Sequence, residues 1–187
     1  MDRIARLLKT VTTALDGAGI PYAVIGGNAV ATWVARRDVG AIRATKDVDL
    51  LLRREDLDRA EVALKPVGLN RDEVLGIPVF LDQDNPIPSH GVHIIVAKEK
   101  VRETAKYAAP DVSDAERVRD GFVVLDLRSL IIMKLDANRR HDQVHIEDML
   151  RVGLIDAELA SGLPDDLLER LRYIRDTMEW FTEPPKF

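Results

Sequence analysis

The sequence predicts an α+β fold in which a mixed sheet is flanked by helices and followed by a helical C-terminal part. Two observations lead to this prediction. Up to residue 97, short apolar runs typical of strands alternate with segments whose apolar residues recur at helical spacing. From residue 126 onwards the pattern is almost entirely helical. We therefore expect a sheet-containing core over residues 1–125, a helical region packed on it over residues 126–181, and a tail over residues 182–187.

Periodicity and turn residues divide the chain into elements. Gly17 and Gly19 end the first helix, and Asn28 and Asp126 are expected as N-caps of later helices. The expected strands are residues 21–25, 47–52, 77–81, 92–97 and 122–125. The expected helices are residues 4–15, 28–36, 55–64, 126–135, 145–152 and 165–179, with a further charged helical segment that ends at residue 107.

The amino-acid composition argues against several classes of protein. The chain has 187 residues, of which 46% are hydrophobic and 32% are charged, as in ordinary globular proteins. A net charge of −5 argues against a generally basic nucleic-acid-binding protein, although a local basic patch is compatible with it. The absence of cysteine excludes disulfides and thiolate metal sites. No apolar run has the length of a membrane span and residues 1–9 lack a signal-like apolar core, so we expect a cytoplasmic protein.

A pair of glycines, Gly26 and Gly27, separates a predicted strand from a predicted helix. Glycine allows a tight turn and close approach of a ligand to the backbone. The free N–H groups at the start of the following helix suit a phosphate. The alternative is a turn with no ligand.

Two carboxylates, Asp47 and Asp49, lie at strand spacing. Alternate residues of a strand share a face, so both side chains point the same way while Val48 and Leu50 point into the core. Two adjacent carboxylates repel each other unless they are solvated, protonated or bridged by a cation. Mg²⁺, with Mn²⁺ as an alternative, satisfies such an oxygen site. The simpler alternative is a solvated strand end.

Together, these features resemble the nucleotidyltransferase superfamily. The resemblance is carried by Gly26-Gly27-Asn28-Ala29 and by the pattern Arg43-x-Thr45-x-Asp47-Val48-Asp49-Leu50. Among the branches of this superfamily, the sequence looks most like small bacterial proteins grouped with abortive-infection nucleotidyltransferase toxins. The resemblance covers residues 20–52 and extends to about residue 155.

The resemblance implies a nucleotidyltransferase-like fold and a set of roles. Asp47 and Asp49 would bind the metal ion and act in catalysis. The nucleotide-binding residues would be Gly26, Gly27, Asn28, Arg43, Thr45, Lys46 and Lys134. The substrate would be an NTP, the acceptor an RNA or protein hydroxyl, and the partner an antitoxin. For Arg43 and Lys46 the alternative is a solvated loop.

One position departs from the family pattern. Active members carry a third carboxylate on a later strand, whereas this sequence has His93 there. An imidazole suits Mg²⁺ less well than a carboxylate does. His93 could instead act as the base that deprotonates the acceptor hydroxyl, or be a structural histidine. Asp82, at the end of the preceding strand, is a fallback third ligand.

A charged cluster follows the predicted core, from Lys134 to Asp148. The resemblance implies that Lys134 reaches the nucleotide phosphates and that Asp142 orders the basic groups. The alternatives are an exposed charged helix end and a metal site formed by His141, Asp142 and His145. In the C-terminal helices, the apolar residues are expected in the core. A partner surface that includes Trp180 and Phe181 is the alternative.

Three functions remain open at this point. The first is an enzyme that transfers a nucleoside monophosphate from an NTP to a hydroxyl, as a toxin of a toxin–antitoxin system. The second is a degenerate module that binds a nucleotide or a partner, which the histidine at position 93 would favour. The third is an antitoxin or regulatory subunit without a nucleotide role.

Overall fold

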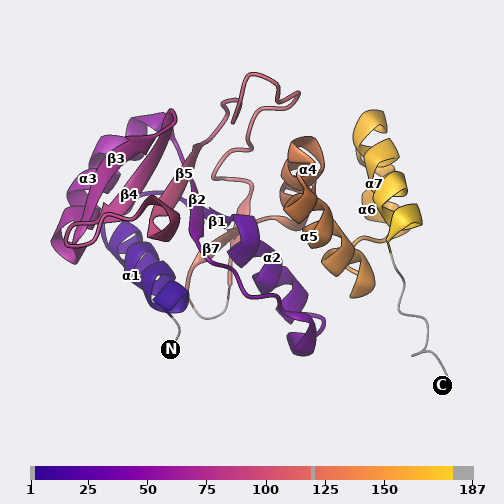
Figure 1. The fold of residues 1–187 in the computed structure, drawn as a ribbon, viewed down its shortest axis with the longest axis horizontal. Coiled ribbons are helices and arrows are strands. Elements are labelled where there is room, and N and C mark those ends of the chain that lie inside the picture. Colours follow the sequence, from indigo (N-terminus) through magenta and orange to yellow (C-terminus); the bar gives the residue numbers. More distant parts are fainter. Residues whose placement is uncertain (1–2, 119–120, 179–187) are drawn as a thin grey trace.

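The fold is built on one mixed β-sheet with helices on both faces (Figure 1). The computed structural model describes residues 3–118 and 121–178. Within these residues the sheet has seven strands in the order β3-β4-β5-β2-β1-β7-β6. The strands are β1 (Ala23–Ile25), β2 (Val48–Leu52), β3 (Leu69–Val74), β4 (Ile77–Asp82), β5 (Val92–Val96), β6 (Ala115–Arg117) and β7 (Val123–Leu125).

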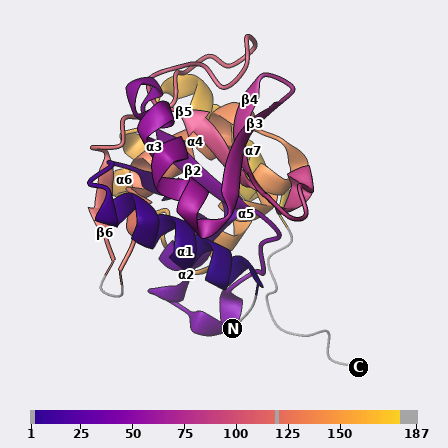
Figure 2. The same cartoon turned by 90° about the vertical axis from the view of Figure 1, so that its left-hand side faces the viewer.

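The strand β2 lies at the centre of this sheet. It pairs with β1 in the antiparallel direction and with β5 in the parallel direction. Its side chains Val48, Leu50 and Leu52 are fully buried with α1 (Arg3–Gly17) and α3 (Leu57–Leu64), which cover one face (Figure 2). Because strand residues alternate between faces, Asp49 and Leu51 belong to the opposite face.

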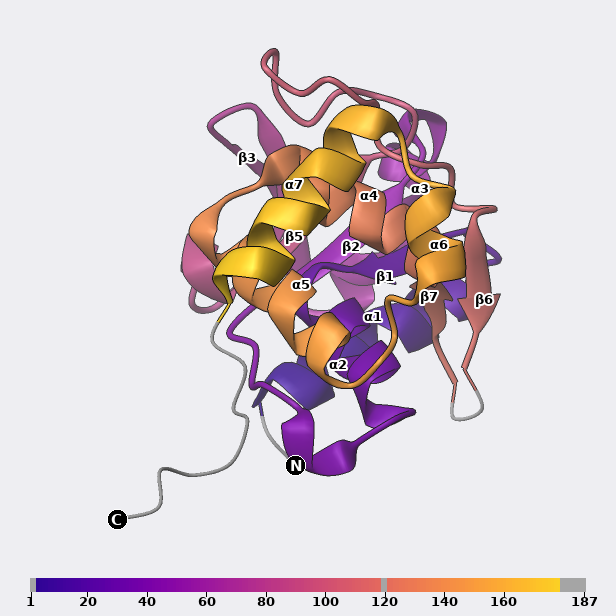
Figure 3. The ribbon, with the colours of Figure 1, turned by 90° about the vertical axis from the view of Figure 1, so that its right-hand side faces the viewer.

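That opposite face is covered by the remaining long helices. They are α2 (Gly26–Ala35), α4 (Leu127–Ala137), α5 (Arg140–Arg151) and α7 (Asp165–Thr177), with the short α6 (Ala157–Ser161) beside them (Figure 3). A single apolar cluster joins Leu51 and Val124 of the sheet to Leu130, Ile146 and Leu171 of these helices. The carboxylates of β2 are therefore placed on the side of the sheet that the C-terminal helices cover.

Local signals explain several helix boundaries. The Asp126 side chain accepts a hydrogen bond from the Ser129 backbone N–H and caps α4, as predicted. Asn138 follows α4 in the left-handed conformation, with φ of 47°. No helix within the described residues is long and apolar enough to cross a membrane.

The structure corrects some of the expected elements. Asn28 is not an N-cap, because α2 already begins at Gly26. The segment 98–107 contains turns and bends but no helix, and α5 begins at Arg140 instead of residue 145. The strands β3 and β6 and the helix α6 were not predicted. Trp180, Phe181 and the predicted tail 182–187 lie outside the described residues.

Candidate nucleotide and metal site

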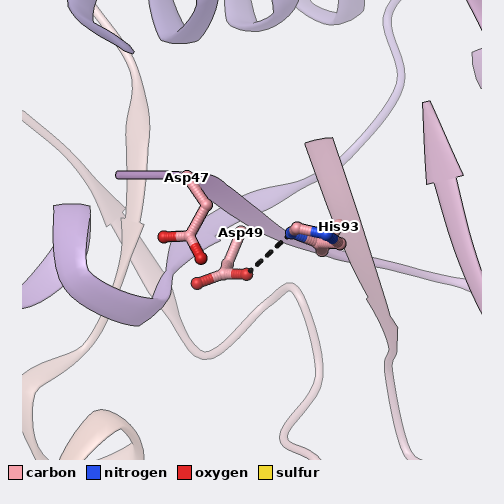
Figure 4. A group of neighbouring side chains, drawn as sticks. All are labelled: Asp47, Asp49 and His93. Atoms are coloured by element: carbon pink, nitrogen blue, oxygen red, sulfur yellow. Dashed lines mark ion pairs between the residues drawn. The ribbon is translucent and has the colours of Figure 1, made fainter. Parts of the chain in front are cut away.

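Three side chains meet above the sheet, from the start of β2 and from the neighbouring β5 (Figure 4). Asp47 immediately precedes β2, and Asp49 is the second residue of that strand. In the parallel pairing of β2 with β5, Asp49 lies opposite His93. Each of the three offers one ligand atom, and these atoms lie within 4.8 Å of one another. Among the described residues this is the one group of at least three potential ligands that meets this criterion.

The electrostatics of this group favour a bound cation. His93 Nδ1 is 3.7 Å from Asp49 Oδ1, and the Asp49 side chain is only 28% exposed. Burial, together with the neighbouring charge of Asp47, raises the pKa of Asp49 to about 6. The charges of His93, Lys134 and Arg139 offset only part of this increase, and a bound cation would offset more of it.

The two glycines lie directly against this group. Ile25, the residue before the turn, pairs with Asp49 in the sheet. Gly26 has a φ of +66°, and a β-carbon there would collide with the Asp49 carboxylate. A β-carbon at Gly27 would lie 2.7 Å from Thr45 Oγ1. Both positions therefore require glycine for space, and Gly26 requires it for its backbone conformation as well.

Asn28 and Thr45, both predicted to bind nucleotide, contact Asp47 in this structure. Asn28 Nδ2 donates to the Asp47 carbonyl oxygen at 2.8 Å. Thr45 Oγ1 donates to Asp47 Oδ1 at 3.2 Å. These bonds fix the backbone and the side chain of Asp47 against the start of α2. The contacts indicate that the two residues position the carboxylate.

A buried ionic cluster forms a second wall of the site. The Lys134 ammonium donates to Asp142 Oδ1 at 2.9 Å, and Arg139 Nε donates to Asp142 Oδ2 at 2.7 Å. Asp142 has no solvent exposure, and the Lys134 side chain is 8% exposed. Burial opposes ionisation of Asp142, but the hydrogen bonds and charges of Arg139 and Lys134 hold its pKa below the ordinary value. Arg139 is a candidate that the sequence does not single out.

Most of the residues described above line one cavity of about 310 Å³, whereas Gly27, Asn28 and Thr45 do not line it. Asp47, Asp49 and His93 lie on the side of the strands, beside Gly26 at the start of α2, and Lys134, Arg139 and Asp142 come from α4, α5 and the turn between them. The rest of the lining is mainly apolar and comes from β1, β4, β5, α4 and the loop after β5.

Other residues considered in the sequence lie elsewhere. Arg43 makes a two-bond ion pair with Asp148 of α5, with both distances at 2.9 Å. Lys46 is exposed and Asp82 binds the backbone of its own loop, and neither lines the cavity. His141, Asp142 and His145 do not form a ligand group in the described part of the chain.

Comparison with known proteins identifies the fold. No protein-family profile and no curated protein sequence matches the chain. A crystal structure of ANT(2'')-Ia in complex with adenylyl-2''-tobramycin has a TM-score of 0.54 and 17% identity, covering 91% of this chain and 96% of that chain. An antigenic nucleotidyltransferase-like protein from Paracoccidioides brasiliensis has a TM-score of 0.57 and 19% identity, covering 92% and 89%. The chain thus has an α+β, nucleotidyltransferase-like fold.

Proposed function

We propose that this protein is a metal-dependent nucleotidyltransferase that moves a nucleoside monophosphate from an NTP to an acceptor hydroxyl. The observation that carries the proposal is the placement of Asp47 and Asp49 beside the Gly26-Gly27 turn, in a cavity that also contains Lys134 and Arg139. A metal–triphosphate complex requires carboxylates that bind the cation, the N–H groups of a helix start that bind phosphates, and cationic side chains. This cavity supplies all three.

The donor set is compatible with a divalent cation. Asp47 and Asp49 supply the carboxylate oxygens that Mg²⁺ or Mn²⁺ prefers, and they face the same cavity. The raised pKa of Asp49 reflects a burial that a cation would offset. When bound, such an ion would supply charge stabilisation at the transferring phosphoryl group.

The protein's own residues would perform the remaining tasks. The N–H groups at the start of α2 would hold the phosphates, with Gly26 and Gly27 allowing their close approach. Lys134 and Arg139 would offset charge that develops on the pyrophosphate. The acceptor oxygen would form a bond to the α-phosphorus while the bond to pyrophosphate breaks, and pyrophosphate would leave with the electron pair. His93 would take the hydroxyl proton.

The finer assignment rests on the sequence resemblance alone. The pattern Arg43-x-Thr45-x-Asp47-Val48-Asp49 supports a toxin of the abortive-infection type, with an RNA or protein hydroxyl as acceptor and an antitoxin as partner. In the structure, Arg43 ties the loop before β2 to Asp148 of α5. We therefore assign Arg43 a role in holding this loop.

The experiment is a label-transfer assay. The protein is incubated with Mg²⁺ or Mn²⁺, each α-labelled NTP in turn, and total RNA or lysate protein. We expect label to appear on one acceptor class and to disappear in Asp49→Asn. Binding of an NTP without transfer from any of the four would instead identify a nucleotide-binding module, the second candidate that His93 at the third-carboxylate position favours.

A further inference from the structure

Beyond the carboxylates, the cavity has an apolar part that the transfer chemistry described above does not use. We define the apolar lobe as Ile77 of β4, Ile95 of β5, Val101 and Tyr107 of the following loop, and Ile132 and Met133 of α4. These side chains are half-buried or exposed, and Val101 is 43% exposed. They line the same cavity as Asp49 and His93. Ile95, Tyr107, Ile132 and Met133 also pack against the core with part of their surface, and the rest of that surface faces the cavity.

The position of the lobe follows from the strand order. The glycine turn lies at the end of β1, on one side of β2, whereas β5 and β4 lie on the other side. Val79 of β4 pairs with His93 in an antiparallel register. This register places Ile77, two residues before Val79, beside Ile95, two residues after His93. The strand residues of the lobe, Ile77 and Ile95, therefore lie on the opposite side of β2 from the start of α2.

In-line transfer places the attacking oxygen and the leaving oxygen on opposite sides of the phosphorus. With the phosphates held at the start of α2, pyrophosphate departs on the β1 side. The acceptor hydroxyl must then approach from the β5 side, where His93 and the lobe lie. We infer that the apolar lobe binds the acceptor and that this acceptor carries its hydroxyl on an uncharged, apolar body. This inference rests on the proposed function.

The charges of the cavity argue against a polycationic acceptor. Four carboxylates line the cavity in the described part of the chain, and each already has a partner or a predicted role. Asp47 and Asp49 face the metal position, and Asp142 is held by Lys134 and Arg139. Asp136 accepts hydrogen bonds from the backbone N–H groups of residues 106 and 107, both at 3.3 Å. No carboxylate is left to bind amino groups of an acceptor.

The loop that supplies Val101 and Tyr107 is firmly attached to the helices. The Tyr107 hydroxyl donates to Asp166 Oδ1 of α7 at 2.7 Å, and Arg102 donates to the Ala137 carbonyl at 2.7 Å. The lobe is thus a formed surface that can select an acceptor by shape and polarity. A phenol is the simplest molecule with this chemistry, and the tyrosine side chain is its protein form.

The test is an NMR titration of protein labelled at isoleucine and methionine methyl groups. With p-cresol we expect shifts at Ile77, Ile95 and Met133 and none at Ile4, which packs on the other face of the sheet. Tobramycin and adenosine should leave the lobe methyl groups unchanged. Val101→Asp, which places a carboxylate in the lobe, should weaken p-cresol binding about tenfold or more. Val62→Asp, at a 74% exposed position on α3, should not.

The outcomes separate the two proposals. Mg²⁺ with each NTP is titrated in parallel and followed at the Ile25 methyl group, beside Asp49. Absence of any NTP response would overturn the proposed function. If the protein responds to an NTP but p-cresol causes no shift, the proposal of an apolar acceptor is overturned and the proposed function stands. The same holds if tobramycin shifts the lobe methyl groups. Adenosine shifts there would show that the lobe binds a nucleoside, either that of the NTP or that of an RNA acceptor, and would likewise overturn the apolar acceptor.

Discussion

The Asp142 carboxylate accepts a hydrogen bond from the Lys134 ammonium at 2.9 Å, in a position without solvent exposure. Arg139 binds the second oxygen of the same carboxylate. One acidic residue on α5 thereby holds two cationic side chains at the cavity that contains Asp47 and Asp49. A lysine directed to this cavity without Asp142 would place a nearly buried charge beside apolar neighbours.

Removal of the negative charge of Asp142 should destabilise the fold. Asp142→Asn leaves Lys134 with little solvent and without its hydrogen-bonded anion, so we expect the free energy of unfolding to fall by about 3 kcal/mol. Urea denaturation measures this change. The double variant Lys134→Met/Asp142→Asn should regain part of the loss because the unpaired charge is gone. A double variant as unstable as Asp142→Asn would contradict this account of the pair.

Gly26→Ala should separate backbone strain from a local collision. The left-handed φ of +66° costs any other residue about 1–2 kcal/mol, and the new β-carbon would displace the Asp49 carboxylate. Gly19→Ala is the matched control, because Gly19 has a φ of +61° and open space around its β-carbon position. We expect both variants to lose stability, Gly26→Ala more because of the added collision, and only Gly26→Ala to lose NTP binding. Equal NTP binding in the two variants would be evidence against the site.

Much of this arrangement follows from patterns that the sequence displays. The alternation around Val48 and Leu50 places Asp47 and Asp49 on one face, and the apolar run 92–97 places His93 on a neighbouring strand. Both depend on local periodicity, which a sequence records directly. The glycine turn beside Asp49 could likewise be predicted from a local pattern, the two glycines between a strand and a helix.

The features that were missed depend on contacts between distant residues. The strand β3 is mostly polar because it lies at the edge of the sheet, so it lacks an apolar run. The segment 98–107 has a helix-like composition, but Asp136 of α4 and Asp166 of α7 bind it in an irregular conformation. The apolar lobe combines residues from β4, β5, this loop and α4, and no local pattern joins them.

His145 should make stability depend on pH. Burial and the charge of Lys134 lower the pKa of His145 to about 4, against the opposing effects of Asp142 and Asp148, while His141 also lowers it. The ring Nδ1 is buried without a hydrogen-bond partner. Because the unfolded chain binds a proton near pH 6.5 and the folded one only near pH 4, stability falls as pH decreases through this window.

We expect a loss of about 1–2 kcal/mol between pH 7 and pH 5, reduced from the full shift because the ring is partly exposed. Urea denaturation at several pH values measures it. His145→Gln should flatten this dependence, whereas His90→Gln, at an exposed loop position, should retain it. A His145→Gln curve parallel to the wild type would assign the pH dependence to other groups.

His93 distinguishes an active enzyme from a degenerate one. If it accepts the hydroxyl proton, His93→Ala should reduce transfer by a factor of about 10² to 10⁴ while NTP binding is nearly retained. The transfer rate is measured with the labelled NTP, and His90→Ala serves as the control. If His93→Ala transfers label at the wild-type rate, His93 is not the base and has only a structural role. Transfer that appears only in His93→Asp would mean that the third carboxylate is essential.

The most direct measurement is calorimetry of NTP binding with and without Mg²⁺ or Mn²⁺, in the wild type, Asp47→Asn and Asp49→Asn. Asp82→Asn is the matched control, since this carboxylate lies at the end of β4 and does not line the cavity. We predict binding that requires the divalent ion, is retained in Asp82→Asn and is lost in both site variants, with the fold intact. Equal NTP affinity in all four proteins would contradict a metal–nucleotide site at Asp47 and Asp49.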